Sequence, residues 1–198
     1  MPLLIYIHGF NSSPDSLKAQ QTRHWFQHNA PHVDVVIPKI PPFAAQAMAL
    51  LQPLVENNGA QPVYVMGSSM GGFFASCLVE RYQLKGVLIN PAVDPSRGLA
   101  NWVGENANYH TGEKWIFEPE HIEEYRALEG KMPADPKKYL LLLQTGDEVL
   151  DYRSAQQRYK NSHLVIEQGG DHSFVGYQQH LPQIYRFLTS EHNFDNRQ

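Results

Sequence analysis

The fold of this chain is decided by residues 62–75, which read PVYVMGSSMGGFFA. The segment Val63–Met66 is apolar and rich in β-branched and aromatic side chains, so it predicts a buried strand. A Gly-x-Ser-x-Gly motif centred on Ser69 follows at once, and the next residues predict a helix over Met70–Tyr82. A strand, a sharp turn and a helix in this order are typical of a turn that exposes a serine hydroxyl above a parallel sheet.

The two glycines of the motif indicate which of two adjacent serines occupies that turn. The turn is so tight that the residues two before and two after the exposed serine need to lack side chains. Gly67 and Gly71 meet this requirement for Ser69 and not for Ser68. The helix that begins behind Ser69 would direct its free N–H groups and its dipole at the same point, where they favour negative charge. We therefore interpret Ser69 as a nucleophile.

Short apolar runs alternate with helical segments on both sides of this motif, which is the pattern of a parallel sheet covered on both faces. We expect strands at Leu3–Ile7, Val33–Ile37, Val63–Met66, Gly86–Asn90, Tyr139–Gln144 and Leu164–Glu167. We expect helices that open at Ser12-Ser13-Pro14-Asp15 and that cover Phe43–Glu56, Met70–Tyr82, Arg153–Lys160 and Tyr177–Leu188, with a kink or an early end at Pro53. The sequence thus predicts one α/β domain, residues 1–198, with a mainly parallel six-stranded sheet and helices on both faces.

One segment, at about residues 95–136, does not follow this alternation of strands and helices, because it contains no convincing strand. It is rich in aromatic side chains, at Trp102, Tyr109, Trp115, Phe117 and Tyr125. A helix is expected over Pro119–Glu129. We interpret the segment as a small flap inserted over the carboxyl edge of the sheet, and an aromatic-rich stretch that only packs on the core is the alternative.

A nucleophilic serine needs a base, and the base needs an acid to orient it. In this type of fold the chain order is serine, acid, histidine. Asp147 follows the apolar strand 139–144 directly, and His172 lies on a glycine-rich turn after the strand 164–167. Both positions are at the carboxyl ends of predicted parallel strands, where such sheets place their sites. We predict that His172 is the base and Asp147 the acid.

Other residues compete for these two roles. Glu148, Asp151 and Asp94 are alternative acids, although Asp151 also suits a helix cap and Asp94 a turn. Among the other histidines, His24, His28 and His32 flank a predicted helix end. Five more do not follow the carboxyl edge of a strand, namely His110, His121, His163, His180 and His192.

Two backbone N–H groups are expected to form an oxyanion hole. One belongs to the residue after the nucleophile, Met70, and the other to the loop after an early strand, for which Phe10 is the best candidate. We expect His8, at the start of that loop, to brace it rather than to take part in catalysis. Cys77 lies in the helix behind Ser69 and is expected in the core.

No metal or cofactor is expected. His24, His28 and His32 recur at four-residue spacing, but Pro31 should end the helix before His32, and no cysteine-rich spacing occurs.

The net charge is −4, with 16 basic and 20 acidic residues and no basic cluster, so nucleic acid is not an expected partner. No segment approaches the roughly 20 apolar residues that span a bilayer. The N-terminus lacks the features of a signal peptide and the chain has a single cysteine, so we expect a cytoplasmic protein. The sequence leaves the oligomeric state open, and a monomer is compatible with it.

Five stretches together resemble the YqiA-like family of small bacterial α/β-hydrolase esterases, in order over nearly the whole chain. They are HGFNSSP (8–14), GSSMGG (67–72), NPAV (90–93), TGDEVLDYR (145–153) and GGDHSF (169–174). The resemblance implies a compact α/β-hydrolase fold and activity on esters with short acyl chains or on acyl-CoA thioesters. It also implies a triad of Ser69, Asp147 and His172. Asp171 departs from the family pattern, which often has an uncharged residue before the histidine.

The leading hypothesis is therefore hydrolysis of carboxylic esters through an acyl-enzyme on Ser69. The first alternative is an acyl-CoA thioesterase with the same triad. Residues 113–131 carry six Glu, two Lys and one Arg, which is a poor surface for an anionic nucleotide. A ligand-binding protein without catalysis is the alternative from another class.

Overall fold

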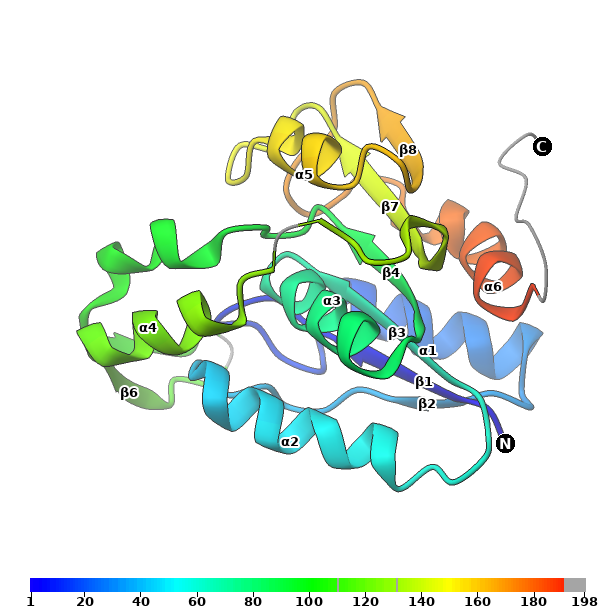
Figure 1. Ribbon diagram of the computed structural model, residues 1–198, viewed down its shortest axis with the longest axis horizontal. Helices are drawn as coiled ribbons and strands as arrows, with labels where there is room; N and C mark the ends of the chain where they lie inside the picture. Colours follow the sequence, from blue (N-terminus) through cyan, green and yellow to red (C-terminus); the bar gives the residue numbers. More distant parts are fainter. Residues whose placement is uncertain (110, 131, 191–198) are drawn as a thin grey trace.

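A computed structural model describes residues 1–109, 111–130 and 132–190, and its centre is one six-stranded parallel sheet (Figure 1). The strand order across the sheet is β2-β1-β3-β4-β7-β8. The strands are β1 (Leu3–Ile7), β2 (Asp34–Val36), β3 (Val63–Ser68), β4 (Lys85–Ile89), β7 (Tyr139–Gln144) and β8 (His163–Glu167). All five pairings in this sheet are parallel, so the predicted six-stranded sheet is confirmed.

Helices cover both faces of the sheet (Figure 1). On one face lie α1 (Leu17–Asn29) and α6 (Leu181–Thr189), whose apolar side chains form a core with one side of the strands. On the other face lie α2 (Ala44–Glu56), α3 (Met70–Tyr82) and α5 (Tyr152–Arg158). The two cores explain why the central strands are apolar without interruption, since both sides of each strand are buried.

Strand β1 shows how this alternation works. Leu3, Ile5 and Ile7 pack on the side of α2 and α3, while Leu4 and Tyr6 pack on the side of α1 and α6. All five side chains are buried. Burying each aliphatic side chain of this size stabilises the fold by roughly 1.5–3 kcal/mol. The strand is thereby fixed in register beside β3, and its carboxyl end reaches the loop that contains Phe10.

The helix boundaries lie within two residues of the sequence predictions except at the starts of the first and the last helix. The first helix begins at Leu17 and not at Ser12, because residues 13–16 form a turn in which the Ser16 N–H donates to the Ser13 carbonyl at 3.1 Å. Serine, proline and aspartate serve such a turn as well as a helix start. Pro53 neither ends nor shortens α2, which continues to Glu56.

The expectation of no strand between residues 95 and 136 is wrong. β5 (Gly104–Ala107) and β6 (Lys114–Phe117) form an antiparallel pair apart from the main sheet. Each strand has only four residues, and β5 has no β-branched or aromatic side chain to reveal it. Two short 3₁₀ helices, Pro95–Arg97 and Leu99–Trp102, precede the pair, and α4 (Pro119–Leu128) follows it close to its predicted place.

The remaining short elements are 3₁₀ turns at Pro136–Lys138 and Tyr177–His180. The second of these replaces the first turn of the helix predicted from Tyr177, so that α6 itself begins at Leu181. Within residues 1–109, 111–130 and 132–190, no helix combines the length and the apolar character needed to cross a membrane.

Candidate active site

Ser69 lies at the junction of β3 and α3 in a strained backbone conformation, with φ 56° and ψ −122°. The chain turns so tightly there that a Cβ atom on Gly67 would lie 2.1 Å from the Gly71 carbonyl oxygen. A Cβ atom on Gly71 would lie 2.0 Å from the carbonyl oxygen of Ile7 in β1. Both glycines are therefore required by close backbone approach, as the motif predicts. Ser68 is the last residue of β3 and is buried.

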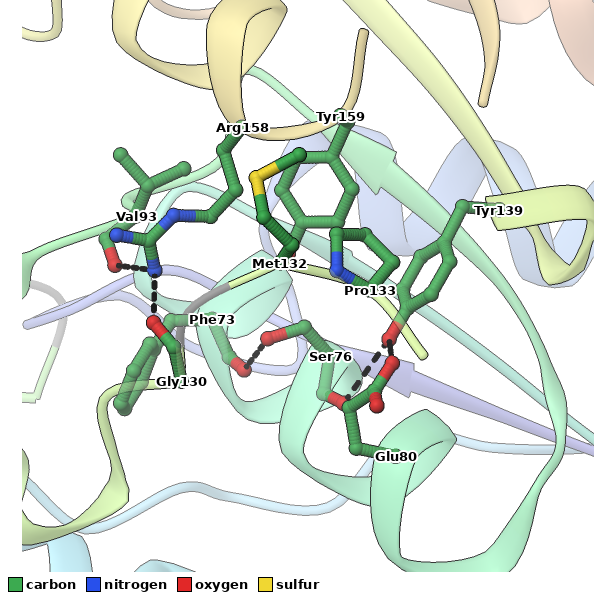
Figure 2. A pocket seen from close by; sticks show the side chains of 10 residues that line it. All are labelled: Phe73, Ser76, Glu80, Val93, Gly130, Met132, Pro133, Tyr139, Arg158 and Tyr159. Carbon is green, nitrogen blue, oxygen red and sulfur yellow. Dashed lines mark hydrogen bonds between the residues drawn. The ribbon is translucent and has the colours of Figure 1, made fainter. Parts of the chain in front are cut away.

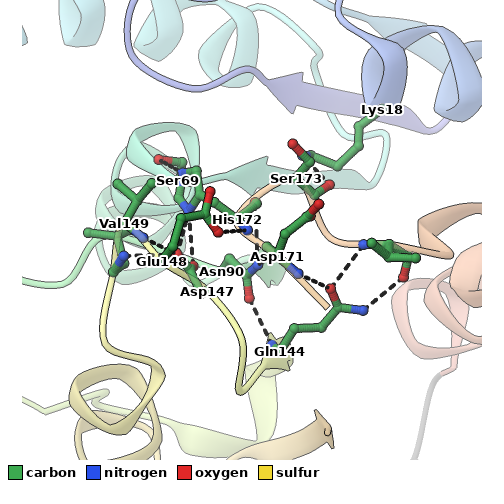
Figure 3. Close-up of polar contacts among 12 residues, drawn as sticks. Lys18, Ser69, Asn90, Gln144, Asp147, Glu148, Val149, Asp171, His172 and Ser173 are labelled. Carbon is green, nitrogen blue, oxygen red and sulfur yellow. Dashed lines mark hydrogen bonds and ion pairs between the residues drawn. The ribbon is translucent and has the colours of Figure 1, made fainter. Parts of the chain in front are cut away.

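The side chains of Ser69, His172 and Asp147 form one hydrogen-bonded chain (Figure 3). His172 Nε2 lies 3.0 Å from Ser69 Oγ, and His172 Nδ1 lies 2.9 Å from each carboxylate oxygen of Asp147. The Asp147 side chain is 1% exposed and that of His172 is 21% exposed. The structure thus brings together three residues that are 25 to 103 positions apart in the chain.

The surroundings of Asp147 keep its carboxylate ionised although it is buried. Burial alone raises the pKa of a carboxyl group. Hydrogen bonds from His172 and from the N–H groups of Leu150 and Val149 outweigh this, and the pKa of Asp147 is lowered. Asp147 Oδ1 accepts from these two N–H groups at 2.8 and 2.9 Å. A negative charge therefore faces the imidazole ring and holds it in one orientation.

The loop that carries His172 is tied to the ends of the central strands by side chains that the sequence analysis did not identify (Figure 3). Asn90, just after β4, donates from Nδ2 to the carbonyls of Asp171 and His172 at 3.0 and 3.3 Å. Gln144, the last residue of β7, accepts from the N–H groups of Asp171 and Val175 at 3.2 and 2.9 Å. Both amide side chains are buried. They fix the backbone on each side of the imidazole.

The three alternative acids have other partners. Glu148 accepts the backbone N–H of His172 at 3.0 Å, and its pKa is lowered by its own N–H and by that of His172. Asp151 caps α5 by accepting the Arg153 N–H at 3.0 Å. Asp94 forms an ion pair with Arg158. Of the four carboxylates considered, it is Asp147 that is hydrogen-bonded to the imidazole.

Phe10 and Met70 are the two residues whose N–H groups are the candidates for an oxyanion hole. Neither has a hydrogen-bond acceptor within the described residues. Both residues line one cavity together with Ser69 and His172. His8 Nε2 accepts the Ile40 N–H at 3.0 Å, so this buried histidine braces the loop before Phe10.

Aromatic side chains from the segment after β4 hold the ring of Phe10. Its centroid lies 5.0 Å from that of Trp102, 5.6 Å from Trp115 and 6.3 Å from Phe117. In the same place Asn11 Nδ2 donates to the Ala107 carbonyl at 3.0 Å. The β5–β6 pair is thus packed directly on the loop that follows β1.

A cleft of about 610 Å³ opens beside Ser69 and His172. Much of its wall is apolar, with Leu99, Trp102 and Leu150 among the lining side chains. This combination of an apolar cleft with a few convergent polar groups is typical of small-molecule sites.

A much smaller cavity, of about 40 Å³, lies between α3 and the end of α5 (Figure 2). There the Tyr139 hydroxyl bonds to Glu80, and Arg158 donates to the carbonyls of Val93 and Gly130 at 3.0 and 2.7 Å. The lining residues include neither Ser69, His172 nor Asp147. These contacts anchor the ends of the segment around α4, and we assign no chemistry to this cavity.

The other candidate residues do not join the site. Burial raises the pKa of the Cys77 thiol to about 12, and its side chain packs against the core. In the described residues, no three His, Cys, Asp or Glu side chains are grouped so as to hold a metal ion. His24 and His28 lie on α1, and His32 contacts Tyr185. His110 and His192 lie outside the described residues.

Comparisons with solved structures agree with this architecture. A protein from Agrobacterium vitis S4 superposes with a TM-score of 0.76 at 18% identity, covering 94% of this chain and 88% of the other. The α/β hydrolase domain-containing protein 10 from mouse gives 0.71 at 13% identity, covering 92% and 88%. Est1E from Butyrivibrio proteoclasticus gives 0.67 at 16% identity, covering 94% and 85%. At these identities the likeness shows a shared α/β-hydrolase fold.

Sequence comparison places the chain more narrowly. A UPF0227 protein of Serratia proteamaculans (strain 568) is 24% identical, in a match that covers 94% of this chain and 99% of the relative. The family model described as "Uncharacterised protein family (UPF0227)" matches residues 3–189. The chain therefore belongs to the UPF0227 family, the YqiA-like family that its motifs predict.

Proposed function

We propose that this protein is a serine hydrolase that cleaves carboxylic esters with short acyl chains through an acyl-enzyme on Ser69. The observation that carries the proposal is the hydrogen-bonded chain from Ser69 through His172 to Asp147 at the edge of a largely apolar cleft. A nucleophile within hydrogen-bond reach of a base, itself oriented by a third group, is the arrangement that covalent acyl transfer needs.

In the first half of the reaction, Ser69 Oγ attacks the acyl carbon and its proton passes to His172 Nε2. The carbonyl oxygen becomes an oxyanion that accepts hydrogen bonds from the N–H groups of Phe10 and Met70. The protonated imidazole is stabilised by the Asp147 carboxylate. It gives its proton to the leaving alcohol as the carbon–oxygen bond breaks, and the acyl group remains on Ser69.

In the second half, water takes the place of the alcohol. His172 removes a proton from the water as its oxygen attacks the acyl-enzyme, and a second oxyanion forms at the same two N–H groups. His172 then returns the proton to Ser69 Oγ, and the carboxylic acid is released. Residues 95–136 act as a flap in this proposal, because Leu99, Trp102 and Tyr109 from that segment line the cleft.

The decisive experiment is turnover of p-nitrophenyl esters of graded acyl length alongside the matched CoA thioesters. We expect neutral short-chain esters to be hydrolysed and a fluorophosphonate probe to label Ser69. Thioesters should be poorer substrates, because six glutamates between residues 113 and 131 oppose an anionic nucleotide. Preferred turnover of the thioesters would make the protein a thioesterase. Absence of turnover and of labelling would make it a binding protein.

The pH dependence of ester turnover tests the role of His172. Only a neutral imidazole accepts the serine proton, so kcat/KM should rise with pH between about 5 and 8. Because the pKa of Asp147 is lowered, its carboxylate stays charged throughout this range, and the acidic limb should follow the loss of one proton. A flat profile, or a limb that needs two protons, would contradict the assignment of His172 as the base.

A further inference from the structure

A second and more polar cavity, of about 160 Å³, adjoins Ser69 and His172 on the side of α1. The apolar cleft is lined by residues such as Leu99 and Trp102, but the residues around this cavity include Tyr6, Ser12, Ser16 and Lys18, which carry hydroxyl or ammonium groups. Both cavities contact the nucleophile and the base. A bound ester therefore has two different environments available to its two halves.

The hydroxyl group of Tyr6 is the first sign that this cavity receives a ligand. The side chain is 0% exposed, and its hydroxyl has no hydrogen-bond partner within the described residues. Buried polar groups are nearly always paired, because an unpaired one loses its bonds to water without compensation. Burial, and to a smaller extent Tyr177, raises the pKa of Tyr6, so its hydroxyl stays protonated and able to donate.

The amino end of α1 is the second sign. This helix of 13 residues has no acidic residue in its first turn, and its N-cap Ser16 makes no side-chain capping bond. The positive end of the helix dipole is instead joined by a cation, Lys18, in the same turn, and the anions that act on this lysine, Asp171 and Asp147, lie outside the helix. A helix start that lacks its usual partner and has a lysine added to it favours a negatively charged ligand.

Lys18 keeps donors free for such a ligand. Its ammonium group donates to the Ser173 carbonyl at 2.8 Å (Figure 3), which uses one of three N–H bonds. Burial lowers the pKa of Lys18, and the carboxylates of Asp171 and Asp147 oppose that shift. Asp171 therefore favours the charged form of Lys18, although its buried Oδ1 atom has no hydrogen-bond partner within the described residues. A single lysine beside these carboxylates suits a monoanion better than a phosphate dianion.

From these observations we propose that the cavity formed by Tyr6, Ser16 and Lys18 binds a carboxylate group of the substrate. The substrates of the site would then be esters that carry a carboxylate a few bonds from the scissile linkage, with the apolar part in the larger cleft. The small volume of the cavity limits the carboxylate-bearing half to a few non-hydrogen atoms. The proposal rests on the esterase activity proposed above.

The test compares three esters of similar size. One is neutral, one is a hemiester of a dicarboxylic acid with the charge on the acyl half, and one is an O-acyl 2-hydroxy acid with the charge on the alcohol half. We expect one of the charged esters to have the highest kcat/KM, and Lys18→Met to reduce that value about 10- to 100-fold. The value for the neutral ester should fall much less, because that ester offers Lys18 no charge to bind. Lys160→Met makes the same change in net charge at an exposed position and should alter neither.

Tyr6→Phe is the second variant, because it deletes only the unpaired hydroxyl. It should leave the melting temperature unchanged or raise it, and it should lower kcat/KM for the same charged ester about fivefold. If Lys18 only braces the His172 loop through Ser173, Lys18→Met will slow all three esters equally. That result, or equal kcat/KM values for charged and neutral esters in the parent protein, would overturn the proposal.

A binding measurement separates this proposal from the esterase proposal. Calorimetric titration of the Ser69→Ala protein with monomethyl succinate and with neutral dimethyl succinate requires no turnover. We expect the charged ligand to bind at least about tenfold more tightly, and Lys18→Met to remove the difference. Such binding without turnover of any ester would reject the esterase and keep the carboxylate site. Equal affinity for the two ligands would reject the site.

Discussion

Ser69→Ala is expected to reduce ester turnover by a factor on the order of 10⁴ or more while the protein remains folded. The substitution removes one hydroxyl group, and with it the bond to His172 Nε2 at 3.0 Å, but it leaves the packing of β3 against α3 intact. Alanine and serine are strained alike at the φ of 56° found there. The measurements are kcat/KM with a short p-nitrophenyl ester, the melting temperature, and labelling by a fluorophosphonate.

Ser68→Ala is the matched control, since it removes the adjacent hydroxyl from the same turn. Ser68 ends β3, and its side chain is not part of the hydrogen-bonded chain to Asp147. It should keep most of the turnover of the neutral ester and all of the labelling. If Ser68→Ala is inactive and Ser69→Ala is active, the nucleophile is Ser68 and the reading of the turn is wrong.

Asp147→Asn should cost several orders of magnitude in turnover with little loss of stability. Val149 and Leu150 both donate to Oδ1, so an asparagine oxygen would stay on these N–H groups and its amide would face His172 Nδ1. Nδ1 would then have to accept, which places the imidazole proton on Nε2, where it blocks transfer from Ser69. In a serine protease the same change costs about 10⁴-fold.

Asp94→Asn and Asp151→Asn are the comparison for Asp147→Asn. Each should lower turnover less than about tenfold, because Asp94 pairs with Arg158 and Asp151 caps α5. Their larger effect should be on the melting temperature. Asp94→Asn should lower it more than Asp151→Asn, since the Asp94–Arg158 pair is less exposed. If either variant loses its turnover while Asp147→Asn keeps near-normal turnover, the residue changed in that variant is the acid.

The parts of the site that could be predicted are those set by local chemistry and chain order. The turn at Ser69 could be predicted because a Cβ atom on Gly67 or Gly71 would lie about 2 Å from backbone atoms, so both positions require glycine in the sequence. Asp147 and His172 could be predicted because each lies on a turn that follows an apolar strand. The strands and helices on both sides of the turn could be predicted because short apolar runs alternate with helical patterns along the chain.

The parts that escaped prediction depend on long-range contacts. Asn90 and Gln144 hold the His172 loop only because β4 and β7 are neighbours in the sheet, and neither side chain shows this by itself. The β5–β6 pair has strands too short for a periodic signal. The cavity of Tyr6 and Lys18 is lined by residues that the sequence does not connect. Tyr6 lies in an apolar strand and is expected in the core, while Lys18 lies in a helix and is expected to face solvent.

The proposed base and the proposed oxyanion hole are held in place by different parts of the fold. His172 is held by side chains at the ends of central strands, while the Phe10 ring is enclosed by Trp102, Trp115 and Phe117 from the segment after β4. Exchanging that segment between relatives would leave the proton relay in place but shift the loop of Phe10. A chimaera that receives a new segment after β4 therefore also needs a side chain at position 10 that packs against it. Substrate selectivity and catalytic rate are then expected to change together.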